Sequence, residues 1–292
     1  MPDILRAIIL MVLGSFLFMW ADLFMKFSTQ NMSLGLVTMM LGGGMAVFFA
    51  VLMRRSEQPF FDRKYLHFAM LMRCGGEAVG VVGIIIALAF SPLSTVTALM
   101  QSLPLVLTIM GAVFLKEPIG WRRVLALMAG LIGVLIIIRP GMAGFDFFAT
   151  FTLLGVAGMA VRDFGTRIMP KEISTATLSF FGASTIVVTG ALMIVVTNDW
   201  SAPTWPGVGF GMGLVFFGSI GTLAVSTAMR LGDVSVISPF RYVRVVFGVG
   251  AGILIFGESV DFPIILGSTI VVAAGLYSWM RERKLAQESV AA

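Results

Sequence analysis

Residues 66–89 read LHFAMLMRCGGEAVGVVGIIIALA, and this stretch decides the class of fold. It is long enough to cross the hydrocarbon core of a bilayer, which takes roughly 20 residues in a helix. Its charged side chains are Arg73 and Glu77. A helix satisfies its backbone hydrogen bonds internally, as a lipid environment requires. The stretch is therefore predicted to be a transmembrane helix.

Nine further apolar runs surround it. The complete set is 4–27, 33–53, 66–89, 94–115, 121–138, 147–168, 174–197, 207–228, 235–256 and 262–280. Of the 292 residues, 58% are hydrophobic and 12% charged, and the mean hydropathy is +1.00. A soluble domain has about twice that share of charge, so the composition excludes a water-soluble enzyme, a disordered tail and a disulfide-rich secreted fold. We predict an all-α membrane protein with ten transmembrane helices.

The connections between these runs alternate in charge, which predicts the orientation. Every second connection, and the C-terminal tail, is basic. Those residues are Arg54, Arg55, Arg63, Lys64, Lys116, Arg122, Arg123, Lys171, Arg230, Arg281, Arg283 and Lys284. The alternate connections 28–32, 90–93, 198–206 and 257–261 contain neither Lys nor Arg, and Arg139 is the exception. By the positive-inside rule both termini are cytoplasmic, in the plasma membrane (the inner membrane of a bacterium).

The remaining composition excludes other classes of partner. The net charge of +5 is explained by cytoplasmic loops rather than by nucleic-acid binding. A single cysteine, Cys74, and a single histidine, His67, provide no disulfide and no metal-ligand spacing. The partners that we expect are therefore the lipid bilayer and a small molecule, with no metal and no cofactor. A homodimer is left open.

The two halves of the chain share a pattern when they are shifted by 141 residues. The aligned pairs are Gly14 with Gly155, Asp22 with Asp163, Lys26 with Arg167, Gly80 with Gly221, Ser94 with Ser235, Gly111 with Gly252, and Glu117 with Glu258. Because five helices are an odd number, a second copy must enter the membrane from the opposite side. We predict two inverted repeats, residues 1–140 and 141–292, a plan common in secondary transporters.

Two segments of the sequence, one in each half, resemble a known family. They are Ser91-Pro92-Leu93, Leu103-Pro104-Leu105, Leu115-Lys116-Glu117 and Gly120-Trp121-Arg122-Arg123, then Ser238-Pro239-Phe240-Arg241-Tyr242-Val243-Arg244 and Phe256-Gly257-Glu258. The chain resembles the EamA type of the drug/metabolite transporter superfamily over nearly its full length. The resemblance implies ten helices in two inverted halves, a central cavity, and transport of small metabolites by alternating access. Amino acids, riboflavin, S-adenosylmethionine and toxic cations are among the substrates it implies.

Charged side chains inside the predicted helices are the strongest indication of a site, because each costs a few kcal/mol in the bilayer. They are Lys26, Arg73, Arg162, Arg167, Arg241 and Arg244, against Asp22, Glu77 and Asp163. This surplus of cations favours a ligand with an acidic group or several acceptors.

We predict that the central cavity is lined by Arg73, Glu77, Gln101, Arg241, Tyr242 and Arg244. An arginine there can hold a carboxylate, a phosphate or a carbonyl-rich ring through its planar fork. Glu77 either balances a cation or carries a coupling proton. The alternative is a static Arg–Glu bridge that joins the helices at 66–89 and 235–256.

Two pairs near helix ends, Asp22 with Lys26 and Asp163 with Arg167, have the four-residue spacing of ion pairs on one helix face. They are candidates for gates at opposite membrane faces. Packing of paired helix ends is the alternative interpretation.

The predicted function is secondary transport of a small polar or amphipathic metabolite, such as an amino acid or a flat acceptor-rich compound like riboflavin. An efflux carrier for drugs or for metabolites such as S-adenosylmethionine is the alternative. An intramembrane enzyme acting on lipids and a channel are the weaker readings, because His67 is the only histidine and inverted halves favour a carrier.

Overall fold

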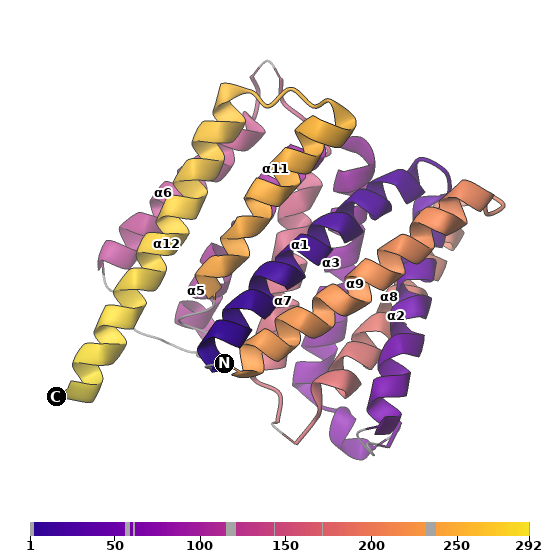
Figure 1. Cartoon of the computed structure of the whole chain (residues 1–292), viewed down its shortest axis with the longest axis horizontal. Helices are drawn as coiled ribbons and strands as arrows, with labels where there is room; N and C mark the ends of the chain where they lie inside the picture. Colours follow the sequence, from indigo (N-terminus) through magenta and orange to yellow (C-terminus); the bar gives the residue numbers. More distant parts are fainter. Residues whose placement is uncertain are drawn as a thin grey trace. The chain divides into compact units, whose positions relative to one another are not determined.

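The computed structural model describes residues 3–55, 59–60, 62–114, 121–142, 144–170, 172–231 and 238–291, and over these residues the chain is helical and contains no strand (Figure 1). The α-helices are α1 (Asp3–Thr29), α2 (Leu34–Arg55), α3 (Phe68–Phe90), α4 (Leu93–Met100), α5 (Leu103–Phe114), α6 (Trp121–Ile138), α7 (Thr150–Arg167), α8 (Thr175–Thr197), α9 (Trp205–Leu231), α11 (Val243–Phe256) and α12 (Phe262–Ala291). Two 3₁₀-helices are η1 (Arg63–Tyr65) and η2 (Ser238–Tyr242).

The all-helical prediction is confirmed for the described residues, with one difference in detail. Seven of the ten predicted runs each coincide with one continuous helix to within three residues at either end, and the run at 262–280 coincides with the first part of α12, which continues to Ala291. The run at 94–115 is interrupted between α4 and α5, and the described part of the run at 235–256 consists of η2 followed by α11. Within the described ranges, six helical segments are long and apolar enough to cross a membrane, and Val124–Ile138 and Phe262–Tyr277 are shorter apolar helices.

The chain forms two compact units, and each of them draws on both halves of the sequence. Unit 1 comprises Met1–Met19, Pro92–Thr150 and Gly221–Ala292, and unit 2 comprises Trp20–Ser91 and Phe151–Ile220. Because the boundaries fall inside α1 and α9, these two helices contribute residues to both units.

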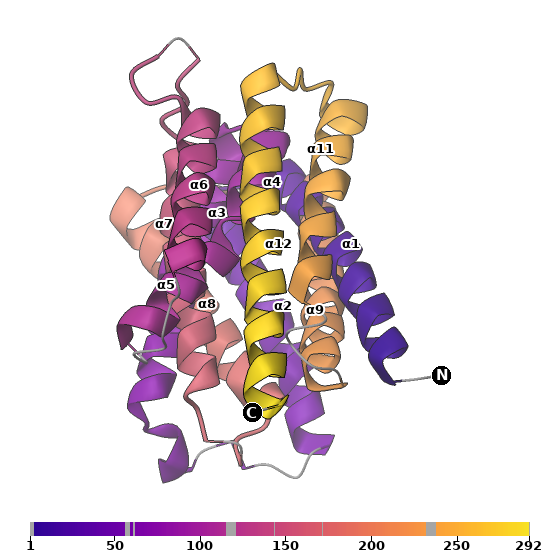
Figure 2. The ribbon, with the colours of Figure 1, turned by 90° about the vertical axis from the view of Figure 1, so that its left-hand side faces the viewer.

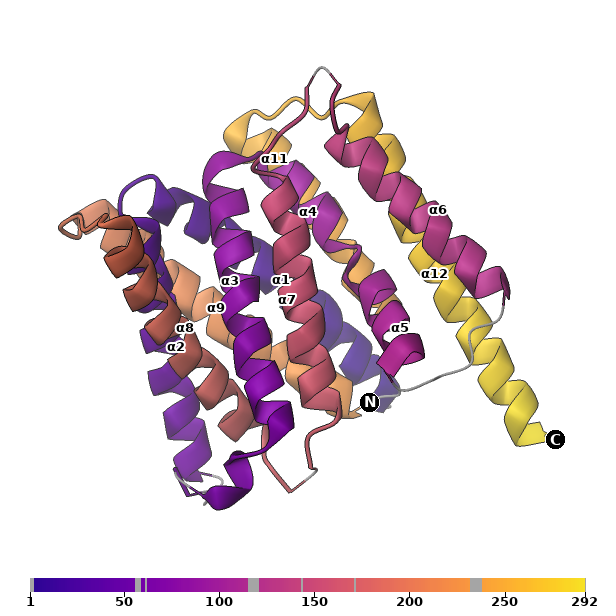
Figure 3. The same ribbon diagram turned by 180° about the vertical axis from the view of Figure 1, so that it is seen from behind.

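In unit 2, α2 and α8 lie side by side along their length (Figures 1 and 3). Glycines allow the close approach: a methyl group added at Gly35 would lie 2.7 Å from the carbonyl oxygen of Gly190. At Gly42 it would lie 2.8 Å from the carbonyl oxygen of Ala183. As the number rises along α2 it falls along α8, so the two helices are antiparallel.

A second seam in unit 2 joins α3 to α7, which Figure 3 shows next to each other. A methyl group at Gly76 would lie 2.6 Å from the carbonyl oxygen of Gly158, and one at Gly83 would lie 2.4 Å from the backbone nitrogen of Gly155. Small residues that let backbones touch are how helices associate where the hydrophobic effect between them is weak. This contact brings the charged residues of α3 and α7 together.

In unit 1, α6 and α12 form the corresponding antiparallel pair (Figure 2). A methyl group at Gly133 would lie 2.8 Å from the carbonyl oxygen of Gly267, and one at Gly267 would lie 2.6 Å from that of Gly133. The interrupted segments also meet in this unit, because α4 packs on α11 and Thr97 fills the space that a side chain at Gly248 would need.

Local side-chain chemistry sets several helix ends. The Nδ1 atom of His67 accepts a hydrogen bond from the backbone N–H of Ala69 and so caps α3, and the hydroxyl of Ser174 accepts from Thr177 and caps α8. At the other end of α8, Asn198 adopts the left-handed conformation that commonly ends a helix, as Gly257 does after α11.

Arg139, the exception to the charge alternation, has a specific partner. Its Nη2 atom lies 3.1 Å from Oδ2 of Asp261, in the connection that precedes α12. The bridge joins the end of α6 to the start of α12 within unit 1. Arg139 remains an exception to the charge alternation on which the predicted orientation depends.

Candidate functional site

The six predicted lining residues divide between the two units. Arg73 and Glu77 belong to α3 in unit 2, whereas Gln101, Arg241, Tyr242 and Arg244 belong to unit 1. Their convergence on one cavity therefore stays a prediction, and each group is described by itself.

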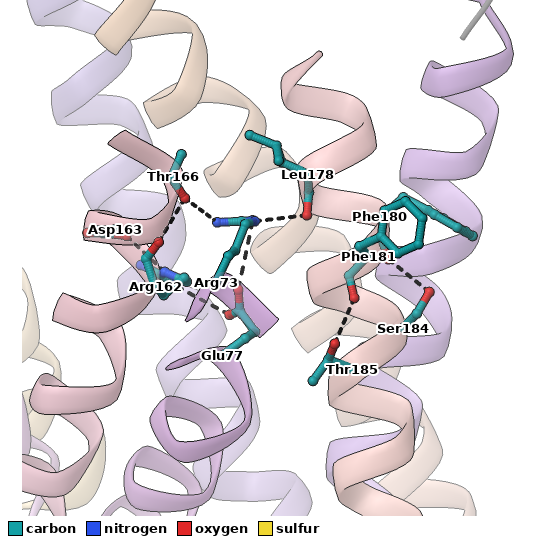
Figure 4. Close-up of polar contacts among 10 residues, drawn as sticks. All are labelled: Arg73, Glu77, Arg162, Asp163, Thr166, Leu178, Phe180, Phe181, Ser184 and Thr185. Carbon is teal, nitrogen blue, oxygen red and sulfur yellow. Dashed lines mark hydrogen bonds and ion pairs between the residues drawn. The ribbon is translucent and has the colours of Figure 1, made fainter. Parts of the chain in front are cut away.

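In unit 2, Arg73 joins three helices (Figure 4). Its Nε donates to the carbonyl oxygen of Leu178 in α8 at 2.9 Å, and its Nη1 donates to Oγ1 of Thr166 in α7 at 2.8 Å. Its Nη2 lies 3.9 Å from Oε2 of Glu77 on the same helix, as the four-residue spacing predicts. The Arg73 side chain is 10% exposed, and each of its three nitrogens contacts an acceptor of the protein itself.

Glu77 is shared by two arginines. Its Oε1 lies 3.3 Å from Nη1 of Arg162 in α7, and Nε of Arg162 donates to Oδ1 of the adjacent Asp163 at 2.9 Å. Two cations and two anions thus alternate along one connected network, and their formal charges cancel. Within unit 2, an Arg–Glu bridge therefore joins α3 to α7. The alternative of a static bridge between residues 66–89 and 235–256 concerns both units and stays a prediction.

Close backbone contacts hold the network in place. A methyl group at Gly165 would lie 2.8 Å from the backbone nitrogen of Arg73, so α7 passes directly beside the root of that side chain. On α8, a methyl group at Gly182 would lie 3.0 Å from Oε2 of Glu77 and 3.3 Å from Nη2 of Arg73. The absence of a side chain at Gly182 therefore leaves the space that the charged groups of Arg73 and Glu77 occupy, and Gly165 allows the backbones of α3 and α7 to approach.

Unit 1 contains the interrupted helices. After α4, the backbone N–H of Gln101 bonds to the carbonyl oxygens of Ala98 and Leu99, so the hydrogen-bond pattern of an α-helix does not continue here. Pro104 lies in the first turn of α5. Tyr242 ends η2 and stands directly before α11. Proline lacks the backbone donor that a continuous helix needs here. Interrupted helices of this kind form the binding centres of many secondary transporters.

The predicted residues at these interruptions are enclosed in different ways. Gln101 is buried, and its Nε2 donates to the carbonyl oxygen of Thr97 at 3.2 Å. Tyr242 is 7% exposed; its hydroxyl lies directly against Gly275 and has no hydrogen-bond partner in the described part of the chain. The guanidinium of Arg244 lies 5.2 Å from the centre of the Phe18 ring. Arg241 is partly buried.

The four gating candidates have the following surroundings. Nζ of Lys26 donates to the carbonyl oxygens of Leu88 and Ser91, at 3.2 and 2.5 Å, at the end of α3. Asp22 is buried, and Asp163 contacts Arg162. The side chain of Arg167 lies outside the described residues. Lys26 thus stabilises a helix C-terminus, where cations are favoured, and a gating role for either pair stays a prediction.

Glu258, one of the motif residues, anchors the turn before α12 to the start of α4. Its Oε1 accepts from the backbone N–H of Leu93 at 2.6 Å, and its Oε2 accepts from the backbone N–H and the hydroxyl of Ser94 at 2.9 and 2.7 Å. Carboxylates are favoured at a helix N-terminus because the first backbone N–H groups of a helix have no acceptor within the helix itself. Glu117, its partner under the 141-residue shift, lies outside the described residues.

Replacing Glu258 by Gln should destabilise the protein by about 1 to 2 kcal/mol, in the range of a lost helix cap. The amide has one acceptor oxygen and presents an N–H₂ group to backbone donors. We expect a lower melting temperature in detergent. Glu172→Gln, outside these contacts, is the control. An equal melting temperature for Glu258→Gln and the control would contradict the capping role.

Interrupted apolar helices and buried, mutually paired ions are the architecture of a membrane transporter. Residues 5–139 match the model of the EamA-like transporter family. The match agrees with the resemblance to the EamA type of the drug/metabolite transporter superfamily that the motifs indicate. The chain is an integral, multi-pass membrane protein and a small-molecule transporter.

Relatives with curated names cover most of the chain. An S-adenosylmethionine uptake transporter of Rickettsia bellii is 26% identical over 70% of this chain and 69% of its own length. A riboflavin transporter of Vibrio cholerae is 29% identical over 76% of this chain and 75% of its own. A pseudopaline exporter of Pseudomonas aeruginosa is 25% identical over 70% and 72%.

A crystal structure similar to this chain covers 96% of it and 98% of the other chain, with a TM-score of 0.65 and 15% sequence identity. At that identity the similarity concerns the fold alone. It extends to both halves of the sequence, whereas the family model matches the first.

Proposed function

We propose that this chain is a secondary transporter that carries a small polar or amphipathic metabolite by alternating access, and that it is a carrier rather than an enzyme. The observation that carries the proposal is the interruption of two helices at corresponding positions. Gln101, which directly follows α4, and Tyr242, which ends η2, are 141 residues apart. Free backbone groups and a kinked helix are what a substrate site in a repeat transporter uses.

The proposal includes two inverted repeats, residues 1–140 and 141–292. Packing within each unit supports it. The 141-residue shift superimposes α2 on α8 and α6 on α12, and these are the pairs that pack together. It also superimposes Gly14 on Gly155; Gly14 lies against Val225, and Gly155 against Ile84, which is the residue that the shift aligns with Val225. A two-fold relation between repeats produces such reciprocal contacts.

The substrate class follows from the polar groups and from the relatives. Arginines and hydrogen-bonding side chains at the interruptions suit a ligand with several acceptors. S-adenosylmethionine and riboflavin, which the named relatives carry, both have flat rings rich in acceptors. We propose uptake of such a metabolite. Efflux is the second candidate, because one relative of comparable similarity is an exporter.

Transport is tested with purified full-length protein in proteoliposomes. We expect saturable uptake of radiolabelled S-adenosylmethionine or riboflavin, and at least fivefold stimulation when the vesicles are preloaded with the same unlabelled compound. Counterflow of this kind distinguishes a carrier from a channel, and analysis of the internal solute detects any product of an enzyme. Protein-free vesicles are the control. A flux that does not saturate, or a chemically altered solute, would contradict the proposal.

The same vesicles address coupling and orientation. We propose that the protein lies in the inner membrane with both termini cytoplasmic, in agreement with the basic connections. Proton coupling predicts that an imposed pH gradient drives accumulation against the solute gradient. Cross-linking at low protein-to-lipid ratio measures whether two copies associate as a homodimer.

A further inference from the structure

Arg162 is one of the intramembrane cations but not one of the six residues that the sequence predicts to line the cavity. Its contacts differ from those of Arg73. Two of its nitrogens bind carboxylates: Nε binds Asp163, and Nη1 binds Glu77. Among the described residues, Nη2 has no hydrogen-bond partner. The side chain is 22% exposed, about twice the exposure of Arg73. Arg162 therefore retains N–H donors that no described residue uses, on a side chain that is partly exposed.

The exposed part of the Arg162 side chain is expected to face water rather than lipid. A guanidinium directed at acyl chains carries a penalty of several kcal/mol, and intramembrane charges instead face the interior of a bundle or a wet cavity. The two carboxylates also fix the plane of the guanidinium before any ligand arrives. Because the guanidinium is already held in one orientation, little conformational entropy of the side chain is lost when a ligand binds to it.

The charge of the network restricts what can bind there. Arg73 and Arg162 are paired with Glu77 and Asp163, and the formal charges of these four residues sum to zero. A lone anion on Arg162 would leave a net negative charge in a medium of low dielectric constant. A carboxylate accompanied by a cationic group, or by a proton, keeps the total at zero, since the cation is attracted to the carboxylates that flank Arg162.

We propose that Arg162 is a substrate-contacting residue, whose free edge binds the carboxylate of a ligand that also carries a positive group. This inference rests on the proposed function and narrows its substrate class. Arg162 then determines specificity, because ligands with a carboxylate bind more tightly than similar ligands without one. Arg73, whose donors go to Leu178, Thr166 and Glu77, positions the network and does not bind the ligand.

The test compares ligands that share a ring system but differ in this head group. S-adenosylmethionine has a carboxylate and an ammonium group; 5′-methylthioadenosine has the same nucleoside and neither. Their competition with labelled S-adenosylmethionine is measured in proteoliposomes for the wild type, Arg162→Lys, Arg162→Gln and the matched control Arg55→Gln. Arg55 is an exposed arginine at the end of α2. Riboflavin, which has no carboxylate, is the third ligand.

We expect wild type and Arg55→Gln to prefer S-adenosylmethionine over 5′-methylthioadenosine by at least tenfold. Arg162→Gln should raise the KM for S-adenosylmethionine at least tenfold and remove the preference, while transport of riboflavin changes less than twofold. Arg162→Lys should restore part of the preference, because it retains the charge but not the fork. If Arg162→Gln fails to fold, Arg162→Gln combined with Asp163→Asn keeps the network neutral and takes its place.

The outcomes separate the two proposals. Saturable riboflavin transport together with no binding of S-adenosylmethionine would overturn the role of Arg162 and leave the proposed function intact. An equal loss of flux for all ligands in a folded Arg162 variant would assign the residue a structural role and overturn the inference. Absence of carrier kinetics for every ligand would overturn the proposed function, and the inference with it.

Discussion

Replacing Arg73 by Gln is expected to lower the free energy of unfolding by about 3 kcal/mol, the lower part of the range for breaking a buried ion pair. The substitution removes the charged link between α3, α7 and α8 and leaves the carbonyl of Leu178 and the hydroxyl of Thr166 without their donor. It also leaves Glu77 with one arginine instead of two. The measurement is denaturation of the purified protein in mixed micelles, followed by tryptophan fluorescence.

Two controls accompany this measurement. Arg55→Gln removes an exposed arginine and should change stability by less than about 0.5 kcal/mol. The double variant Arg73→Gln with Glu77→Gln should recover part of the loss, because it returns Arg162 and Asp163 to a neutral pair. If Glu77→Gln lowers the stability of the Arg73→Gln variant as much as it lowers that of the wild type, the two residues are not coupled.

Replacing Gly76 by Ala should be similarly damaging, at about 2 to 3 kcal/mol, for a steric reason. The new methyl group would lie 2.4 Å from the backbone nitrogen of Arg162 and 2.6 Å from the carbonyl oxygen of Gly158. Backbone atoms cannot turn aside as a flexible side chain can, so α3 and α7 must separate. That separation also lengthens the contact between Glu77 and Arg162, so we expect transport to fall along with thermal stability.

The neighbouring residue provides the matched control. A methyl group at Gly75 meets nothing within 4 Å, so Gly75→Ala adds the same atom to the same helix without a clash. It should leave stability unchanged or raise it slightly, because alanine favours the helix. Equal melting temperatures for the two variants would show that the seam between α3 and α7 is not tightly packed in the membrane protein.

Much of the helical pattern was predictable from the sequence, because lipid demands long apolar helices and their limits are visible as charged or Pro-rich connections. The run at 121–138 coincides with α6, and that at 174–197 differs from α8 by one residue. The interruption at Gln101 was less visible. Pro104 indicated a kink, but the residues around it are as apolar as those of a continuous helix, so hydropathy alone cannot locate the end of α4.

The candidate site was predicted unevenly, for a physical reason. The pairing of Arg73 with Glu77 follows from spacing on one helix. The partnership of Glu77 with Arg162 joins residues 85 positions apart and depends on how α3 packs against α7, which one sequence does not reveal. The 141-residue shift gave no help either, because Arg162 aligns with Ala21. A usable signal was present nonetheless: Arg162 adjoins Asp163, and an intramembrane arginine beside a carboxylate indicates a polar cluster.

Because the formal charges of Arg73, Glu77, Arg162 and Asp163 cancel, a transmembrane voltage does almost no net electrical work on this group when the helices move. One unbalanced elementary charge crossing the full field would exchange about 2.3 kcal/mol per 100 mV. The network can therefore travel with α3 and α7 at little electrical cost. Any electrogenic current should then reflect the charge of the cargo and of ions that accompany it.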